Sequence, residues 1–154
     1  MIYVECKPDW VLVTSLLKKT DRVMHLGNKS EVCKRLKKTE NCIGMVDEDP
    51  ESIQPKYLEE LELECDLNPL QLKVLNDRDA SNRLILLRPR LEEWIIGTAR
   101  KEGFTLETFG LSSNPKTLHS IINLYIMRFK NLVEVLKTSE PVRTLKRLLE
   151  RSTI

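Results

Sequence analysis

The chain has 154 residues, of which 41% are hydrophobic and 31% charged, a balance typical of a folded domain and not of a disordered chain. Its net charge of +2 is too small to require a nucleic-acid partner, but it is unevenly spread. Residues 1–50 hold nine Lys/Arg and eight Asp/Glu, residues 51–80 three and eight, and residues 81–154 thirteen and seven. The basic last part can attract phosphates, although a solvated helix surface accounts for it equally well.

The four cysteines, Cys6, Cys33, Cys42 and Cys65, show no Cys-x-x-Cys or zinc-finger spacing, so we do not expect a structural zinc site. No apolar run approaches the roughly 20 residues needed to cross a bilayer. The chain begins directly with a strand-like run, without a signal peptide. We therefore predict a cytoplasmic protein with reduced thiols and no membrane association.

The first fifty residues predict alternating strands and helices. The expected elements are a strand at 2–4 that ends at Glu5, a helix from Pro8 to Lys19, a strand at 22–26, a helix capped by Ser30 and ending at Lys38, and a strand at 42–46 that leads into Asp47-Glu48-Asp49-Pro50. Short connections between such units favour a parallel sheet flanked by helices.

The rest of the chain predicts further strands and then helices. The expected elements are a short helix at 55–63, strands at 71–75 and 83–87, a helix at 89–101, a long helical segment from 115 to 136, and a last helix after Pro141. We predict an α/β domain over residues 1–110. Residues 111–154 are expected to form a helical extension that packs on the same domain or on a partner subunit, which would make a homo-oligomer.

Three carboxylates stand at the ends of predicted strands. Glu5 ends the first strand, Asp47 ends the third, and Asp49 lies two residues further on. Ligands of open α/β sheets gather outside the carboxyl ends of the strands, and carboxylates two apart on an extended segment project to the same side. Together the three can hold a hard cation such as magnesium, although acidic residues at strand ends often only cap a helix or solvate a loop.

The same segments resemble toprim domains, which occur in topoisomerases, bacterial primases, recombination proteins, OLD-family nucleases and small ribosomal-RNA maturases. The similar stretches are Ile2-Tyr3-Val4-Glu5, Gly27-Asn28-Lys29-Ser30 and Met45-Val46-Asp47-Glu48-Asp49. The resemblance covers residues 1–50 well and residues 51–100 loosely. It implies a toprim-like parallel sheet between helices, magnesium (or manganese) on Asp47 and Asp49, and Glu5 as a general acid/base. The family usually has glycine after the glutamate, where this chain has Cys6.

Other polar residues near these segments are weaker candidates. Lys7 and Lys29 can contact a phosphate, but isolated lysines are usually solvated. Glu92 can add an accessory carboxylate, or it can simply stabilise the positive end of a helix dipole. His25 and His119 show no metal-ligand spacing. His25 ends a predicted strand near the acidic residues, and a structural role is expected for it.

Three functions fit these observations. The first is metal-dependent phosphodiester chemistry on DNA or RNA, as in a nuclease, with metal on Asp47 and Asp49 and Glu5 moving a proton. The second is a toprim-like module that binds metal and nucleic acid, or a partner protein, without cleavage. The third is an unrelated flavodoxin-like receiver or small-molecule domain. A receiver typically has an acidic pair after its first strand, and here Glu5 stands alone.

Overall fold

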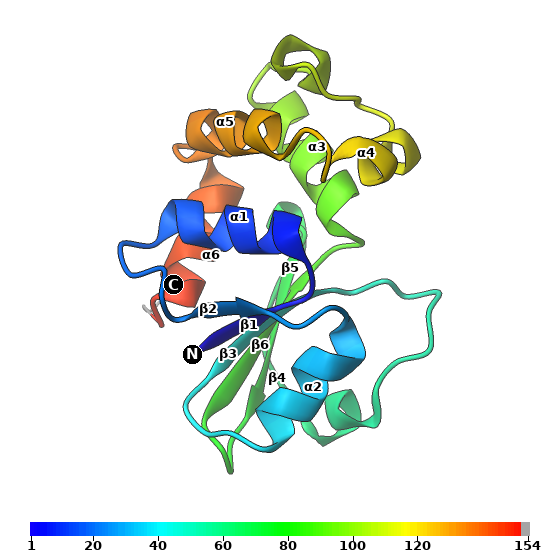
Figure 1. The fold of residues 1–154 in the computed structure, drawn as a ribbon. Coiled ribbons are helices and arrows are strands. Elements are labelled where there is room, and N and C mark those ends of the chain that lie inside the picture. Colours follow the sequence, from blue (N-terminus) through cyan, green and yellow to red (C-terminus); the bar gives the residue numbers. More distant parts are fainter. Residues whose placement is uncertain (152–154) are drawn as a thin grey trace.

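The computed structural model describes residues 1–151, which form a six-stranded, mostly parallel sheet flanked by α-helices (Figure 1). The strands are β1 (Ile2–Val4), β2 (Val23–His25), β3 (Ile43–Asp47), β4 (Glu62–Leu67), β5 (Leu72–Asp77) and β6 (Asn82–Leu87). The helices are α1 (Lys7–Leu16), α2 (Lys29–Lys37), α3 (Leu91–Lys101), α4 (Pro115–Ile121), α5 (Ile126–Leu136) and α6 (Glu140–Leu149). Short 3₁₀ helices are η1 (Lys56–Glu60), η2 (Asn68–Leu70) and η3 (Leu106–Phe109).

The strand order is β2-β1-β3-β6-β5-β4. The first four of these run parallel, whereas β5 pairs antiparallel with both β6 and β4. The predicted α/β fold with a parallel sheet is therefore correct, with an antiparallel hairpin added at one side. Because β1, β3 and β6 are neighbours and parallel, their carboxyl ends meet at one edge of the sheet.

Helices cover both faces of the sheet (Figure 1). Alternate strand residues point to opposite faces, so Tyr3 packs with α2 on one side while Val4 packs with α1 on the other. The α2 side is a small hydrophobic cluster that includes Leu36 and Leu84. The opposite side is the larger cluster, to which α1, α3, α4, α5 and α6 all contribute.

The C-terminal helices belong to the larger cluster. Phe129 and Leu132 of α5 and Leu145 of α6 are fully buried, in the same hydrophobic cluster as residues of the β-strands. Leu124 and Met127 remain exposed on the outer surface. Self-association through these helices and the predicted division at residue 110 stay predictions.

Two local expectations were wrong. The helix at 29–37 is capped by Asn28, whose Oδ1 accepts the N–H of Glu31, and not by Ser30. The long helical segment is interrupted at residues 122–125, which separate α4 from α5. Among the helices of residues 1–151, none has the length and apolarity required to cross a membrane.

Candidate functional site

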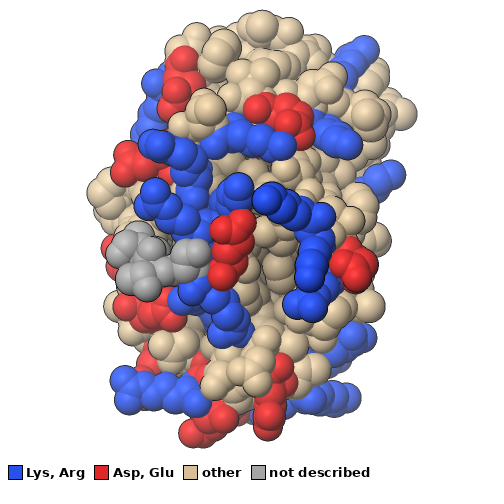
Figure 2. All heavy atoms as spheres, turned by 90° about the vertical axis from the view of Figure 1, so that its left-hand side faces the viewer, with Lys and Arg blue, Asp and Glu red and all other residues tan. Residues whose placement is uncertain are grey.

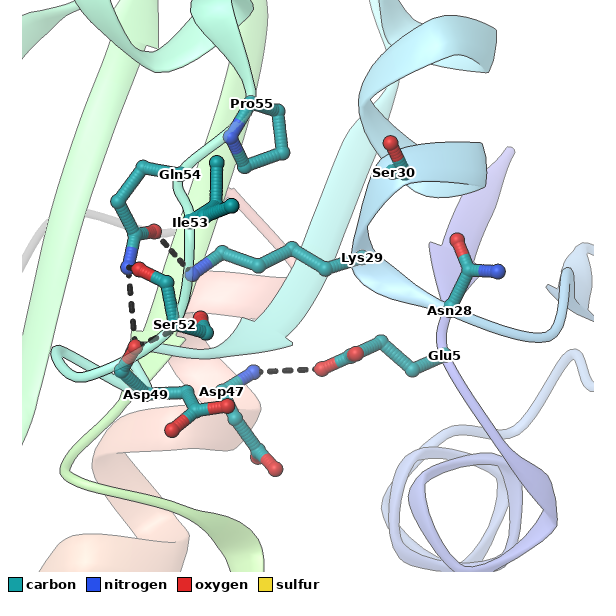
Figure 3. Close-up of a pocket in the computed structure, with 10 residues that line it drawn as sticks. All are labelled: Glu5, Asn28, Lys29, Ser30, Asp47, Asp49, Ser52, Ile53, Gln54 and Pro55. Carbon is teal, nitrogen blue, oxygen red and sulfur yellow. Dashed lines mark hydrogen bonds between the residues drawn. The ribbon is translucent and has the colours of Figure 1, made fainter.

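The site begins where β1 and β3 end side by side. Glu5 follows β1, and its Oε2 accepts the backbone N–H of Asp47 at 2.7 Å. This bond turns the Glu5 side chain across the sheet edge towards Asp47, as Figure 3 shows. The parallel pairing of β1 with β3, Val4 opposite Met45, is what brings these two residues together from 42 positions apart in the sequence.

Asp9, on the first turn of α1, is a buried acid close enough to Glu5 and Asp47 for their charges to interact. Asp9 is 2% exposed, and its Oδ2 accepts both the N–H and the S–H of Cys6, at 3.2 and 3.0 Å. Cys6 therefore caps α1 together with Asp9. The residue after Glu5 therefore has a structural role in this chain.

Hydrogen bonds and an ion pair fix the carboxylates of Asp47, at the end of β3, and of Asp49, in the loop after it. Asp47 Oδ1 accepts the N–H of Leu91, the first residue of α3, at 2.9 Å. Asp49 pairs with Arg90 at 3.3 Å between Oδ1 and Nε. Asp49 has a φ of 42°, so the segment is not extended there, contrary to the expectation from the sequence. Both carboxylates nevertheless line the same two hollows.

The first of these, the Lys29 hollow, has a volume of about 300 Å³ and contains Glu5, Lys29, Asp47 and Asp49 in its lining (Figure 3). The Lys29 side chain crosses the hollow, and its ammonium donates to Glu48 O at 2.7 Å and to the side-chain oxygen of Gln54. Lys29 thus fastens the loop after β3 to the start of α2. Its role in phosphate binding stays a prediction.

The second, the His119 hollow, lies on the α3–α4 side and has a volume of about 640 Å³. Asp47 and Asp49 line it together with Arg90, Glu92 and His119. Glu92 is only 7% exposed, and its Oε1 lies 2.7 Å from Nδ1 of His119 on α4. Asp47 and Asp49 therefore stand between two hollows.

Burial and mutual repulsion raise the pKa values of the acids at this edge. Burial, with the charges of Asp9, Glu5 and Glu92 added, raises the pKa of Asp47 to about 9. Burial also raises the pKa of Asp9 to about 7 and that of Glu5 above its ordinary value. Lys29 is itself buried, and desolvation lowers its pKa. Negative charge at this edge is therefore poorly compensated by the chain's own cations.

Asp47 and Asp49 are the candidate ligands for a hard cation. Asp47 and Asp49 offer carboxylate oxygens only, the ligands that magnesium prefers. A further carboxylate oxygen, Oε2 of Glu93 in the lining of the His119 hollow, is shielded from solvent and has no hydrogen-bond partner among the described residues. Residues 1–151 contain no group of three or more His, Cys, Asp or Glu side chains gathered closely enough to hold a metal. Water and substrate oxygens would have to complete the coordination, as is usual for magnesium.

The fold brings most, but not all, of the site residues predicted from the sequence to the two hollows. Glu5, Lys29, Asp47, Asp49 and Glu92 all line one hollow or the other. Lys7 is exposed at the start of α1 and lines neither hollow.

Asp9 and His119 belong to the site although sequence reasoning gave them no role in it. The spacing Cys6-x-x-Asp9 is that of a capping box and could have shown that Asp9 turns inward. No local signal points to His119, because its partner Glu92 lies 27 residues away.

No family model, no curated protein and no solved structure matches this chain.

Proposed function

We propose that this protein carries out metal-dependent phosphodiester chemistry on nucleic acid at the edge formed by Glu5, Asp47 and Asp49. The observation that carries the proposal is the shared position of Asp47 and Asp49 between two hollows, beside a half-buried Glu5. A phosphate seated there would have one carboxylate base on its β1 side and open space on its α3–α4 side.

Magnesium (or manganese) would be held by Asp47 and Asp49, where it would neutralise charge on the phosphate and orient it for attack. Glu5 would accept a proton from the attacking water through Oε1, since Oε2 is occupied by the N–H of Asp47. Burial raises the pKa of Glu5, which makes its carboxylate a better proton acceptor than an exposed glutamate.

The surface charge supports a polyanionic substrate. Lys and Arg side chains gather across the face shown in Figure 2. Lys18, Lys19 and Arg22 are exposed after α1, and Arg143 and Arg147 are exposed on α6. Among the described residues, no carboxylate lies within 4 Å of these five cations. Lys18, Lys19 and Arg22 line a hollow with Met1 and Ile2 at the amino ends of the strands, the edge opposite Glu5 and Asp47. Such a surface raises the concentration of nucleic acid around the whole molecule, and not at the acidic edge itself.

A second candidate is a module that binds metal and nucleic acid, or a protein, without cleavage. The pairing of Asp49 with Arg90 favours it, because a cation on Asp49 would have to compete with that guanidinium. The use of one Asp47 oxygen to cap α3 favours it as well.

The test is incubation of purified protein with single- and double-stranded DNA and RNA, in magnesium, manganese or EDTA. We expect cleavage that needs metal and that falls by at least about 10²-fold in Glu5→Gln and Asp47→Asn. Asp21→Asn, at an exposed turn, is the matched control and should cleave like the wild type. Metal-dependent binding without cleavage would select the second candidate, and cleavage that survives both substitutions would contradict the proposed site.

A further inference from the structure

Within residues 1–151, the Glu92–His119 pair is the one acid–imidazole contact at the sheet edge. Glu92 is buried, with a side chain 9% exposed, whereas the side chain of His119 is 80% exposed. Donation from Nδ1–H to the carboxylate fixes the orientation of the ring and leaves the second nitrogen, Nε2, for another partner.

The pair is more than a connection between helices. α3 and α4 already pack through fully buried apolar residues, among them Ile95 and Leu118. A histidine that keeps four-fifths of its surface exposed adds little burial to that contact. Its position is instead set by a buried carboxylate, and it lines the same hollow as Asp47 and Asp49.

Glu5 and His119 line different hollows that share the two aspartates. Glu5 lines the Lys29 hollow, His119 lines the His119 hollow, and Asp47 and Asp49 line both. In-line displacement at phosphorus needs the attacking and leaving oxygens on opposite sides of the phosphate. A phosphate held at the shared aspartates, with the base in one hollow and the acid in the other, would meet this requirement.

Resting on the function proposed above, we propose that His119 is the general acid of the reaction and that Glu92 is its positioning residue. Water attacks phosphorus and gives its proton to the Glu5 carboxylate. The bond from phosphorus to the leaving oxygen breaks, and that oxygen takes the proton from Nε2 of protonated His119. The products are a phosphate monoester and a free hydroxyl, after which Glu5 loses its proton to solvent and His119 regains one.

The charged groups that face the imidazole in this hollow come from four elements. They are Asp47 at the end of β3, Asp49 in the loop after it, Arg90, Glu92 and Glu93 around the start of α3, and Lys116 on α4. The lining thus holds four acidic groups and two basic ones besides the imidazole.

The test compares substrates whose leaving groups differ in their need for a proton. An oligonucleotide leaves as an alkoxide and needs one, whereas bis(p-nitrophenyl) phosphate releases p-nitrophenolate without one. We expect His119→Gln to lose roughly 10²- to 10⁴-fold in kcat on the oligonucleotide, and to stay within a few-fold of wild type on the nitrophenyl ester. His25→Gln, the other exposed histidine, is the matched control and should match the wild type on both substrates.

Glu92 is tested by the difference between two substitutions. Glu92→Gln keeps an oxygen that accepts from Nδ1–H, whereas Glu92→Ala leaves the ring unsupported. We expect Glu92→Gln to retain more oligonucleotide cleavage than Glu92→Ala, with both close to wild type on the nitrophenyl ester. Circular dichroism melting confirms that each variant is folded.

The outcomes separate this inference from the proposed function. A wild type that cleaves oligonucleotides, with His119→Gln equally active, would overturn the role of His119 and leave the proposed function standing. Equal losses on both substrates would also overturn the acid role. A wild type inactive on every substrate and with either metal would overturn both proposals.

Discussion

Asp47 joins three parts of the fold through its own atoms. Its backbone N–H is held by Glu5 after β1, its side chain caps α3 through Leu91, and it closes β3, the strand between β1 and β6. Its carboxylate is also crowded by other acids, so the residue that organises the sheet edge carries an electrostatic cost. That cost makes stability sensitive to pH.

The metal-free protein should lose stability as the pH rises from about 5 to about 9. The folded pKa of Asp9 is about 7 and that of Asp47 about 9, both above the ordinary 3.8. An acid whose pKa is raised by folding stabilises the fold while it is protonated, and this contribution is lost as the pH passes through the folded value. The change in the free energy of unfolding is on the order of 1 kcal/mol for each pH unit crossed by one such group.

Denaturant unfolding in EDTA from pH 5 to pH 9 measures this dependence. Asp9→Asn should flatten it, mainly below pH 7, whereas Asp21→Asn should run parallel to the wild type because Asp21 is exposed. A stability that rises with pH over this window would contradict the assignment of buried, repelling acids.

For single residues, the sequence predicted well that Glu5 and Asp47 lie at strand ends, because a short apolar run followed by an acid indicates a buried strand that ends at that acid. It was a poor guide to Glu92, which looked like an ordinary acid in the first turn of a helix. Its burial and its contact with His119 depend on where α4 lies, and no local pattern encodes that packing.

At the scale of elements, α2 packs closely against β3 at Gly44, which has no side chain. A Cβ atom on Gly44 would come within 2.8 Å of Leu36 Cδ1 and 2.9 Å of Leu84 Cδ1. The close approach holds α2 against the sheet, and α2 in turn carries Lys29 to the loop after β3.

Gly44→Ala should therefore destabilise the protein by about 1–3 kcal/mol, because the added methyl group overpacks the α2 side of the core. Gly97→Ala is the matched control: Gly97 lies within α3, its added Cβ would meet nothing within 4 Å, and helix propensity predicts a gain of about 0.5–1 kcal/mol. Equal effects of the two substitutions in denaturant unfolding would contradict this packing.

The elements were predictable where periodicity is local and strong. Apolar runs located β1, β3 and β6, and stripes at helical spacing located α3 and α6. β4 was missed because its residues are acidic and mostly exposed, so it shows no buried run. The interruption between α4 and α5 was missed because residues 122 and 125 keep the apolar spacing on either side of the break.

At the scale of the whole molecule, the helices after residue 110 complete the larger core cluster. Leu132 and Leu136 of α5, with Val142 and Leu145 of α6, are each buried to 1% exposure or less. Arg83 of β6 also donates to Leu148 O at 2.8 Å, which connects α6 directly to the sheet.

Residues 1–110 alone should consequently fail to fold, because the fragment lacks α4, α5 and α6 and so exposes the apolar residues of α1, α3 and the sheet that these helices bury. Circular dichroism and thermal melting of this fragment measure the effect. In the full chain, Phe129→Ala should cost about 3–5 kcal/mol, whereas Met127→Ala, at a position 63% exposed, should cost little. A fragment that melts cooperatively would instead establish residues 1–110 as a domain of their own.

The edge strand β4 carries three acids, Glu62, Glu64 and Asp66, and each pairs with an arginine: Arg78, Arg83 and Arg88 respectively. The strand also departs from regular pairing between Leu63 and Cys65. An open sheet edge is a template on which another chain can add a strand, and charges and irregular pairing both hinder that addition. This row of charged residues should therefore hinder edge-to-edge aggregation of the protein. Because salt screens exposed charges, we expect aggregation to increase as the ionic strength rises.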